Sequence, residues 1–377
     1  MPRRATKRGT ERTALDRDCD VLICGASFAG LAVARELAGT GADVMVIDRY
    51  EIGERQTSAC GIPTTWLTAM RLQESLRQTF GELVIHTPHT TARYDLPWTF
   101  STFDYRTLCA ALAAQGEFAF ETAKVDARAG DGVVLTDRGE IRAPLIVDAL
   151  GWRRVLCTGD NIQPPDALLS RGLEVHPHGS GRDLEVWIHR GYVPAGYGWR
   201  FPADGELRIG IGSFDPRFHV REPTVQLAHD LDAETVRYQG NWIPHALRPA
   251  TEDGVFFVGD SAGHCLPLTA EGIRTALYFG LACGRELRRV VGGEQTRAQA
   301  LTRYHEFSAA HATPFRWMLR VQRLVPRIAP RLLAPGLQAM GAKRFVDWSF
   351  GHYLGVAHPD FVATGGPRQP GPVLAAA

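Results

Sequence analysis

The chain has 377 residues, which at about 100 to 200 residues per domain predicts roughly two domains. Its 42 Lys and Arg balance 41 Asp and Glu for a net charge of +1, and 45% of the residues are hydrophobic. This composition excludes a largely disordered chain and gives no electrostatic reason to expect a nucleic acid partner.

A strand, a helix and a second strand are expected near the N-terminus, at residues 21–24, 31–38 and 44–48. The turn between the first strand and the helix is GASFAG, at residues 25–30. Glycines placed after a strand and before a helix, with an acid ending the next strand, are typical of a dinucleotide-binding βαβ unit. The alternative is an ordinary tight turn.

The residues of this unit have separate roles. Gly25 permits the tight turn, and Gly30 lets the helix and the strand pack closely. Ser27 replaces the usual middle glycine, and its hydroxyl can donate to a phosphate held at the helix N-terminus. Asp48 is expected to accept from ribose hydroxyls. The cofactor-binding residues predicted in this unit are Gly25, Ser27, Phe28, Ala29, Gly30, Asp48 and Arg49.

Later elements follow in chain order. A helix is expected from about residue 106 to 112, and buried strands at 133–135 and 145–149. Short alternating segments between Gly and Pro at 165–245 predict an antiparallel sheet. A strand returns at 254–258, and a helix begins near residues 270–273.

Three motifs occur in a fixed order: the GASFAG turn with Asp48, Gly259-Asp260 between strand and helix, and PAGYGWRFP at residues 194–202. The last matches the pattern PxxYxWxFP in full. With these motifs, residues 20–355 resemble the FAD-dependent geranylgeranyl reductase family, within the para-hydroxybenzoate hydroxylase-like flavoprotein fold.

The resemblance implies an α/β fold with a Rossmann-like FAD-binding domain, an inserted antiparallel-sheet substrate domain and a helical C-terminal region. The expected parts are a disordered arm (1–19), the FAD domain (20–164 and 246–300), the sheet domain (165–245), the C-terminal helices (301–362) and a flexible tail (363–377).

The resemblance also implies site residues. Arg106 would reach an FAD phosphate or ribose, and Asp260, beside Gly259, would hold a ribityl hydroxyl. The helix beginning at Gly272 and Ile273 would point its N–H groups at the edge of the flavin where negative charge accumulates.

Three aromatic residues at period two, Tyr197, Trp199 and Phe201, share one face of a strand and would line the substrate cavity over the flavin. The alternative is a plain sheet core. Cys60, followed by a glycine, is the catalytic candidate, able to tune the flavin or donate a proton; free cysteines are otherwise small buried hydrophobes. His264 and Glu271 are further protic candidates.

The leading hypothesis is a flavoenzyme that takes electrons from NAD(P)H or another donor and reduces carbon–carbon double bonds of a prenyl or similar hydrophobic small molecule. A monooxygenase is the alternative, although residues 149–154 (ALGWRR) lack the Ala-Asp-Gly-x-x-Ser pattern of such hydroxylases. A halogenase is disfavoured because residues 8–123 contain no lysine. A non-catalytic flavin-binding or lipid-carrier protein is a fourth reading.

The compartment is expected to be cytoplasmic. The seven cysteines form no CxxC pair, and the first twenty residues contain no apolar stretch that would act as a secretory signal. No metal site is expected, because the 13 histidines show no ligand spacing. The sequence does not define an oligomeric state.

Residues 307–346 contain no acid, and five arginines recur there at helical spacing, opposite apolar residues. The arginines are Arg316, Arg320, Arg323, Arg327 and Arg331, and the apolar residues are Val321, Val325, Ile328 and Leu332. Such a segment predicts peripheral contact with an anionic membrane surface. The alternative is that the apolar face covers the substrate domain, with Pro326 and Pro330 interrupting the helix.

Overall fold

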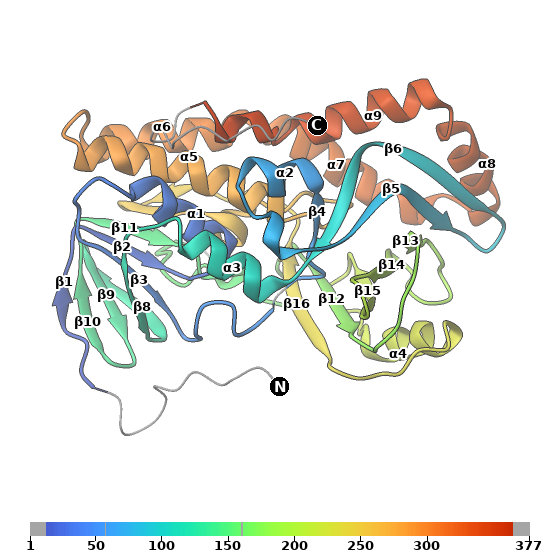
Figure 1. Ribbon diagram of the computed structural model, residues 1–377, viewed down its shortest axis with the longest axis horizontal. Coiled ribbons are helices and arrows are strands. Elements are labelled where there is room, and N and C mark those ends of the chain that lie inside the picture. Colours follow the sequence, from blue (N-terminus) through green and yellow to red (C-terminus); the bar gives the residue numbers. More distant parts are fainter. Residues whose placement is uncertain (1–12, 57, 160, 365–377) are drawn as a thin grey trace.

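The computed structural model describes residues 13–56, 58–159 and 161–364 (Figure 1). Within these residues the strands form three sheets. Two of them occupy the left half of Figure 1, the third occupies the right half, and the later helices run along the top of both.

The dinucleotide half is built on a six-stranded sheet of order β17-β18-β11-β2-β3-β7. Its strands are parallel except β17, and the inner ones are continuous apolar runs because both faces are covered. The bounds are β2 (Val21–Cys24), β3 (Val44–Asp48), β7 (Ala119–Thr122), β11 (Leu145–Asp148), β17 (Thr251–Glu252) and β18 (Val255–Phe257). The expected βαβ unit is therefore present.

Helices α1 (Phe28–Leu37) and α5 (Ile273–Val291) pack against each other over this sheet. Glycines allow the close crossing: a Cβ at Gly280 would lie 2.6 Å from the carbonyl oxygen of Ala29. Helix α3 (Tyr105–Ala113) covers α1 from the other side and begins one residue before the expected start. Its N-cap is Asp104, which accepts from the N–H of Thr107.

A smaller four-stranded sheet has the order β1-β10-β9-β8. Its strands are β1 (Arg17–Asp18), β8 (Val125–Gly130), β9 (Val133–Thr136) and β10 (Gly139–Arg142). The expected disordered arm was therefore drawn too long, because β1 pairs with β10. The first twelve residues of that arm, and residues 365–377 of the expected tail, lie outside the described residues.

The third sheet has eight strands in the order β16-β12-β15-β14-β13-β5-β6-β4. They are β4 (Gly61–Pro63), β5 (Leu76–His86), β6 (Thr91–Phe103), β12 (Leu169–Val175), β13 (Leu184–Trp187), β14 (Gly196–Pro202), β15 (Leu207–Ser213) and β16 (Gln239–Pro244). Short helices accompany the two halves: α2 (Thr64–Ala69), α4 (Arg221–Asp230), and the 3₁₀ turns η1 (Gln73–Ser75), η2 (Gly151–Arg153) and η3 (Gly259–Ala262).

This sheet corrects the expected domain boundary. Residues 61–103, assigned to the dinucleotide domain, supply three of its strands, and β5 pairs in parallel with β13 through Leu83 and Leu184. The chain thus leaves the dinucleotide half twice. Local patterns could not show this, because the two paired strands lie about a hundred residues apart in sequence.

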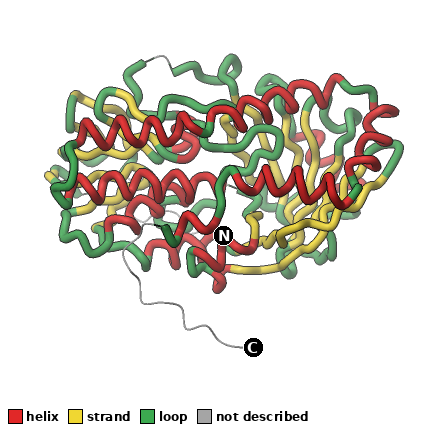
Figure 2. Tube along the Cα trace, turned by 90° about the horizontal axis from the view of Figure 1, so that it is seen from above, coloured by secondary structure: helices red, strands yellow, loops and turns green. Residues whose placement is uncertain are grey.

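The C-terminal helices are α6 (Arg297–Ala310), α7 (Ala312–Leu324), α8 (Pro330–Met340) and α9 (Lys343–Gly355), with the turns η4 (Val325–Arg327) and η5 (Pro359–Val362). Seen from above, helices lie along the length of the molecule over the strands (Figure 2). Helix α6 packs on the dinucleotide half, where Tyr304 donates to the carbonyl oxygen of Phe257 at 3.0 Å. None of the helices in the described part of the chain could span a bilayer.

Candidate active site

A cavity of about 940 Å³ lies between the two halves of the molecule. Ligand pockets usually measure about 300 to 1,000 Å³, so this one is large enough for an extended ligand. One end is lined by the turn after β2 and by the end of β3, and the other end by β5, β6, α8 and α9. The two halves of the fold therefore share a single site.

The first end carries the glycine turn. Gly25 has a positive φ of 116°, and a Cβ there would lie 2.3 Å from the carbonyl oxygen of Ala149. A Cβ at Gly30 would lie 1.9 Å from the oxygen of Gly25. Neither glycine lines the cavity, so both act by allowing close packing.

The residues between the two glycines do line the cavity: Ser27, Phe28 and Ala29. No side chain caps α1 and no acid lies in its first turn, so its positive end is open to an anion. The Ser27 hydroxyl lies 3.0 Å from the hydroxyl of Tyr105, a cavity residue that the sequence analysis missed. This is the environment that a pyrophosphate requires.

Asp48 lies at the end of β3 and lines the same end of the cavity, with Arg49 beside it. Its two carboxylate oxygens accept from the backbone N–H groups of Ala26 and Tyr50, at 2.9 and 3.0 Å. These bonds hold the carboxylate next to the glycine turn, where the ribose of a dinucleotide would lie.

The middle of the cavity is lined by Gly259, Asp260, Gly272 and Ile273, all of them predicted from the sequence. Gly272 is the N-cap of α5 and Ile273 its first residue, so this helix end also faces the cavity. Among the described residues, no group hydrogen-bonds the side chain of Asp260. Burial raises the pKa of Asp260 to about 6 although Arg248 opposes the shift.

A carboxylate that is partly withdrawn from water and has no hydrogen-bond partner is costly unless a ligand supplies a donor. The ribityl hydroxyl of FAD is such a donor. Together with the open end of α1, the fixed carboxylate of Asp48 and the tight glycine turn, this makes the described residues fit FAD.

Tyr197, Trp199 and Phe201 lie on β14 and all three line the cavity, as predicted. Trp199 lies over β15, because a Cβ at Gly210 would lie 2.3 Å from its ring. Its indole Nε1 donates to Glu174 at 3.0 Å, and the Tyr197 hydroxyl donates to the carbonyl oxygen of Thr269 at 2.7 Å. These bonds fix two sides of an aromatic wall.

Beyond this wall the cavity is lined mainly by aliphatic and aromatic side chains from three regions. They are Leu83, Ile85, Tyr94, Leu96 and Phe100 of β5 and β6, Val321, Leu324, Val325 and Ile328 of α7 and the segment after it, and Leu333, Leu337, Met340, Phe345, Val346 and Phe350 of α8 and α9. The first and third groups were not predicted from the sequence. Alternation within β5 and β6 was the available signal, since Leu83 and Ile85, and Tyr94 and Leu96, stand two apart.

Besides Gly25 and Gly30, three predicted site residues do not line the cavity. Arg106 is exposed on α3, one position after Tyr105, which takes the cavity side. Cys60 is fully buried in the core and its thiol contacts the carbonyl oxygen of Ser58 at 3.2 Å. Burial raises the pKa of the Cys60 thiol, which makes it a poor nucleophile or proton donor.

His264 is also buried away from the cavity. Its ring stacks on Phe279 with centroids 3.7 Å apart, and its Nε2 bonds to Ser308 at 2.9 Å. Burial lowers the pKa of His264 well below its usual value, so the ring is neutral. Arg106, Cys60 and His264 share one feature: a residue next to each of them in sequence lines the cavity. An offset of one residue turns the side chain away from the cavity.

Glu271, in contrast, lines the cavity just before α5. Its carboxylate forms a two-pronged ion pair with Arg274, at 2.8 and 2.9 Å, and accepts from the hydroxyl of Tyr353. Tyr353 also lines the cavity, and burial raises its pKa well above the usual value, helped by Glu271. The Tyr353 hydroxyl therefore remains protonated at neutral pH.

Comparisons with known proteins find flavoprotein relatives of this chain. A family model for an FAD binding domain matches residues 18–82. Digeranylgeranylglycerophospholipid reductase 3 of Methanosphaera stadtmanae is 24% identical, over 78% of this chain and 83% of that protein. The crystal structure of a geranylgeranyl bacteriochlorophyll reductase-like protein from Thermoplasma acidophilum has a TM-score of 0.78 at 16% identity and covers 92% of this chain and 98% of its own.

The chain is thus similar to geranylgeranyl reductases over most of its length, and its residues 18–82 match an FAD binding domain. Its fold is also shared with another kind of flavoprotein. PqsL, a probable FAD-dependent monooxygenase from Pseudomonas aeruginosa, has a TM-score of 0.61 at 16% identity and covers 89% of this chain. The fold of this chain is therefore found both in a geranylgeranyl reductase-like protein and in a probable monooxygenase.

Proposed function

We propose that this protein reduces carbon–carbon double bonds in a prenyl chain, or in a hydrophobic chain of similar shape, with FAD as its redox cofactor. The carrying observation is the cavity itself, which joins the FAD-fitting end to a long apolar chamber of β5, β6, α8 and α9. Relatives named for digeranylgeranylglycerophospholipid support a prenyl substrate.

The residues that would hold FAD lie in two groups. The open N-terminus of α1 and Asp48 would bind the pyrophosphate and the adenosine ribose. Asp260 would accept from a ribityl hydroxyl, and the N-terminus of α5 would face the negative edge of the flavin. Reduced FAD would supply the hydride. An external reductant, NADPH or another donor, would have to return the oxidised FAD to its reduced form.

The apolar chamber would orient the chain. Tyr197, Trp199 and Phe201 form a flat wall. The Trp199 ring packs over Gly210 of β15, and Glu174 holds it there through a hydrogen bond. Such a wall suits the planar carbons of an isoprene unit and excludes water from them.

Reduction of an alkene needs a proton as well as a hydride. We assign the proton to the Oη of Tyr353, which lines the cavity beside the start of α5 and is positioned by its hydrogen bond to Glu271. Tyr353→Phe should lower turnover by about 10²- to 10⁴-fold, the usual effect of a general acid. FAD affinity should be unchanged, because the ring remains.

Anaerobic turnover tests the proposal. The yellow protein is bleached with dithionite, or in a second arm with NADPH, and a geranylgeranyl lipid is then added without oxygen. Each double bond reduced consumes one hydride and one proton, so mass spectrometry should find products heavier by two hydrogens per bond. Reoxidation only by oxygen, with an oxygen atom in the product, would instead establish a monooxygenase.

A further inference from the structure

The helical end of the molecule is arranged differently from the expected arginine-striped helix. Val321, Val325 and Ile328 line the cavity, so these apolar residues are not free to meet a membrane. The arginines belong to separate elements, since α7 ends at Leu324 and α8 begins at Pro330. The alternative reading, in which the apolar face covers the substrate chamber, holds for this segment.

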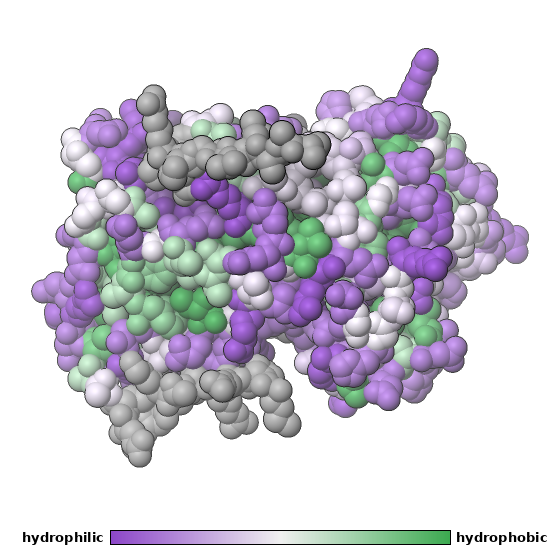
Figure 3. Space-filling view, viewed as in Figure 1, coloured by the Kyte–Doolittle hydropathy of each residue, from purple (hydrophilic) through white to green (hydrophobic). Residues whose placement is uncertain are grey.

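A different apolar surface lies on α8 and α9, at the right-hand end of Figure 1. Leu332 is 68% exposed and Trp348 is 59% exposed, and Met340 and Phe345 are also exposed. The rings of Phe345 and Trp348 lie 5.8 Å apart. Figure 3 shows hydrophobic side chains among hydrophilic ones over this end. We call Leu332, Met340, Phe345 and Trp348, with the cations Arg331, Lys343 and Arg344, the α8–α9 corner.

The corner is strongly biased in charge. Residues 307–346 contain seven Arg and Lys and no Asp or Glu. All seven cations are exposed. The first acid after this segment, Asp347, pairs with Lys343 at 3.1 Å. A surface that combines exposed Trp, Phe and Leu with an excess of cations over acids is complementary to an anionic lipid bilayer.

The corner is also continuous with the cavity. Met340 and Phe345 are exposed on one side and line the cavity on the other. Leu333, Leu337 and Val346, on the same two helices, continue the lining inward. The apolar chamber therefore reaches the surface at the corner.

We propose that the α8–α9 corner docks on an anionic membrane surface and that the cavity opens there to receive the lipid chain directly from the bilayer. The choice of lipid chain rests on the proposed function, whereas the docking itself does not. Leu332 and Trp348 enter the interface, Arg331, Lys343 and Arg344 meet the lipid headgroups, and Met340 with Phe345 forms the rim of the opening.

The test is flotation of the FAD-loaded protein with vesicles of equal parts phosphatidylcholine and phosphatidylglycerol, and with phosphatidylcholine alone. The protein should float with the mixed vesicles at low salt and be released by high salt. The double variant Leu332→Ser/Trp348→Ser should bind the mixed vesicles at least about ten-fold more weakly than the unmodified protein. Arg331→Gln/Arg344→Gln should lose a similar factor, only for the anionic vesicles.

The matched control is Ile162→Ser/Tyr238→Ser, which removes apolar side chains that are 64% and 45% exposed elsewhere on the protein. This control should float as the unmodified protein does. Equal loss in both double variants, no flotation of the unmodified protein, or self-association through the corner in place of lipid binding would each overturn the proposal.

Turnover separates docking from function. Leu332→Ser/Trp348→Ser should reduce detergent-dispersed lipid at the unmodified rate but vesicle lipid at a lower rate, because neither residue lines the cavity. Equal rates on vesicles would overturn docking as the route of substrate entry. Flotation without reduction of any prenyl lipid would leave docking established and the proposed reaction wrong.

Discussion

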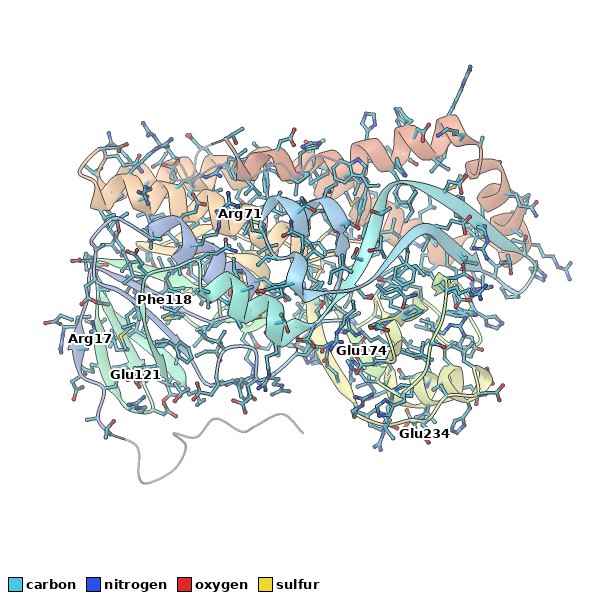
Figure 4. The ribbon with its side chains drawn as sticks, viewed as in Figure 1. Arg17, Arg71, Phe118, Glu121, Glu174 and Glu234 are labelled. Carbon is cyan, nitrogen blue, oxygen red and sulfur yellow. The ribbon has the colours of Figure 1, made fainter. Side chains whose placement is uncertain are left out.

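The indole Nε1 of Trp199 on β14 donates to the carboxylate of Glu174 on β12 at 3.0 Å, across the intervening strand β15. The same carboxylate accepts from His176 at 2.9 Å and Gln239 at 3.0 Å. Glu174 is labelled in Figure 4, where it lies near the middle of the molecule. One buried carboxylate thus holds the central residue of the aromatic wall.

Replacing this carboxylate should destabilise the fold. Glu174→Leu leaves the buried donors of Trp199 and His176 without an acceptor, which we expect to lower the free energy of unfolding by about 3 kcal/mol. Glu174→Gln keeps an oxygen and should cost about 1 kcal/mol. Urea denaturation measures both, and equal losses would show that the carboxylate is not what fixes the wall.

The neighbouring His176 predicts a pH dependence of stability. Burial by itself would lower the pKa of His176, but its bonds to Glu174 and Glu206 raise it from 6.5 to about 9. The protonated ring therefore stabilises the folded state fully below pH 6.5, and this contribution is lost as the pH rises through about 9. We expect a loss on the order of 2 kcal/mol.

The measurement is urea denaturation at pH 6 and at pH 9.5, compared with His176→Gln. The variant should be less stable at the lower pH and should show a smaller decline between the two. A variant whose stability falls as steeply as that of the unmodified protein would assign the decline to other groups.

Asp260 predicts a pH dependence of FAD binding. Burial raises the pKa of Asp260 to about 6, so the carboxylate is lost as the pH falls through that value. Because only the ionised form makes a charge-assisted bond to a ribityl hydroxyl, FAD affinity should fall about ten-fold below that pH. Fluorescence titration of the FAD-free protein measures it, and Asp260→Asn should bind weakly with no such step near pH 6.

Cys60 separates the sequence prediction from the structure. Its thiol lies in the core and points away from the cavity, so Cys60→Ser should leave turnover and the flavin spectrum unchanged. Stability should fall by about 1 kcal/mol, because a hydroxyl replaces a buried thiol. Loss of turnover in a folded, FAD-loaded Cys60→Ser protein would restore the catalytic reading of this residue.

Many of the residues that the motifs singled out line the FAD-fitting end of the cavity. Ser27, Phe28, Ala29, Asp48, Gly259, Asp260, Gly272 and Ile273 all line the cavity, because each stands at a strand end or a helix start that short-range pattern defines. Arg106 and Cys60 were proposed from the family resemblance and His264 from its place in the loop before α5, and none of the three lines the cavity. A single residue decides which way a side chain points. A nearby motif does not determine the direction of a side chain.

The sequence by itself determined the βαβ unit, the aromatic strand, the second helix end at Gly272 and the acid-free C-terminal segment, since all of these are contiguous stretches of the chain. Only the tertiary structure showed that residues 61–103 join the large sheet, since β5 pairs with a strand about a hundred residues later. Only it turned Val321, Val325 and Ile328 into the cavity and left Leu332 and Trp348 exposed. The physical reason is that hydrophobic patterning marks which face of a helix is buried. Packing between elements that are distant in sequence decides which surface covers that face.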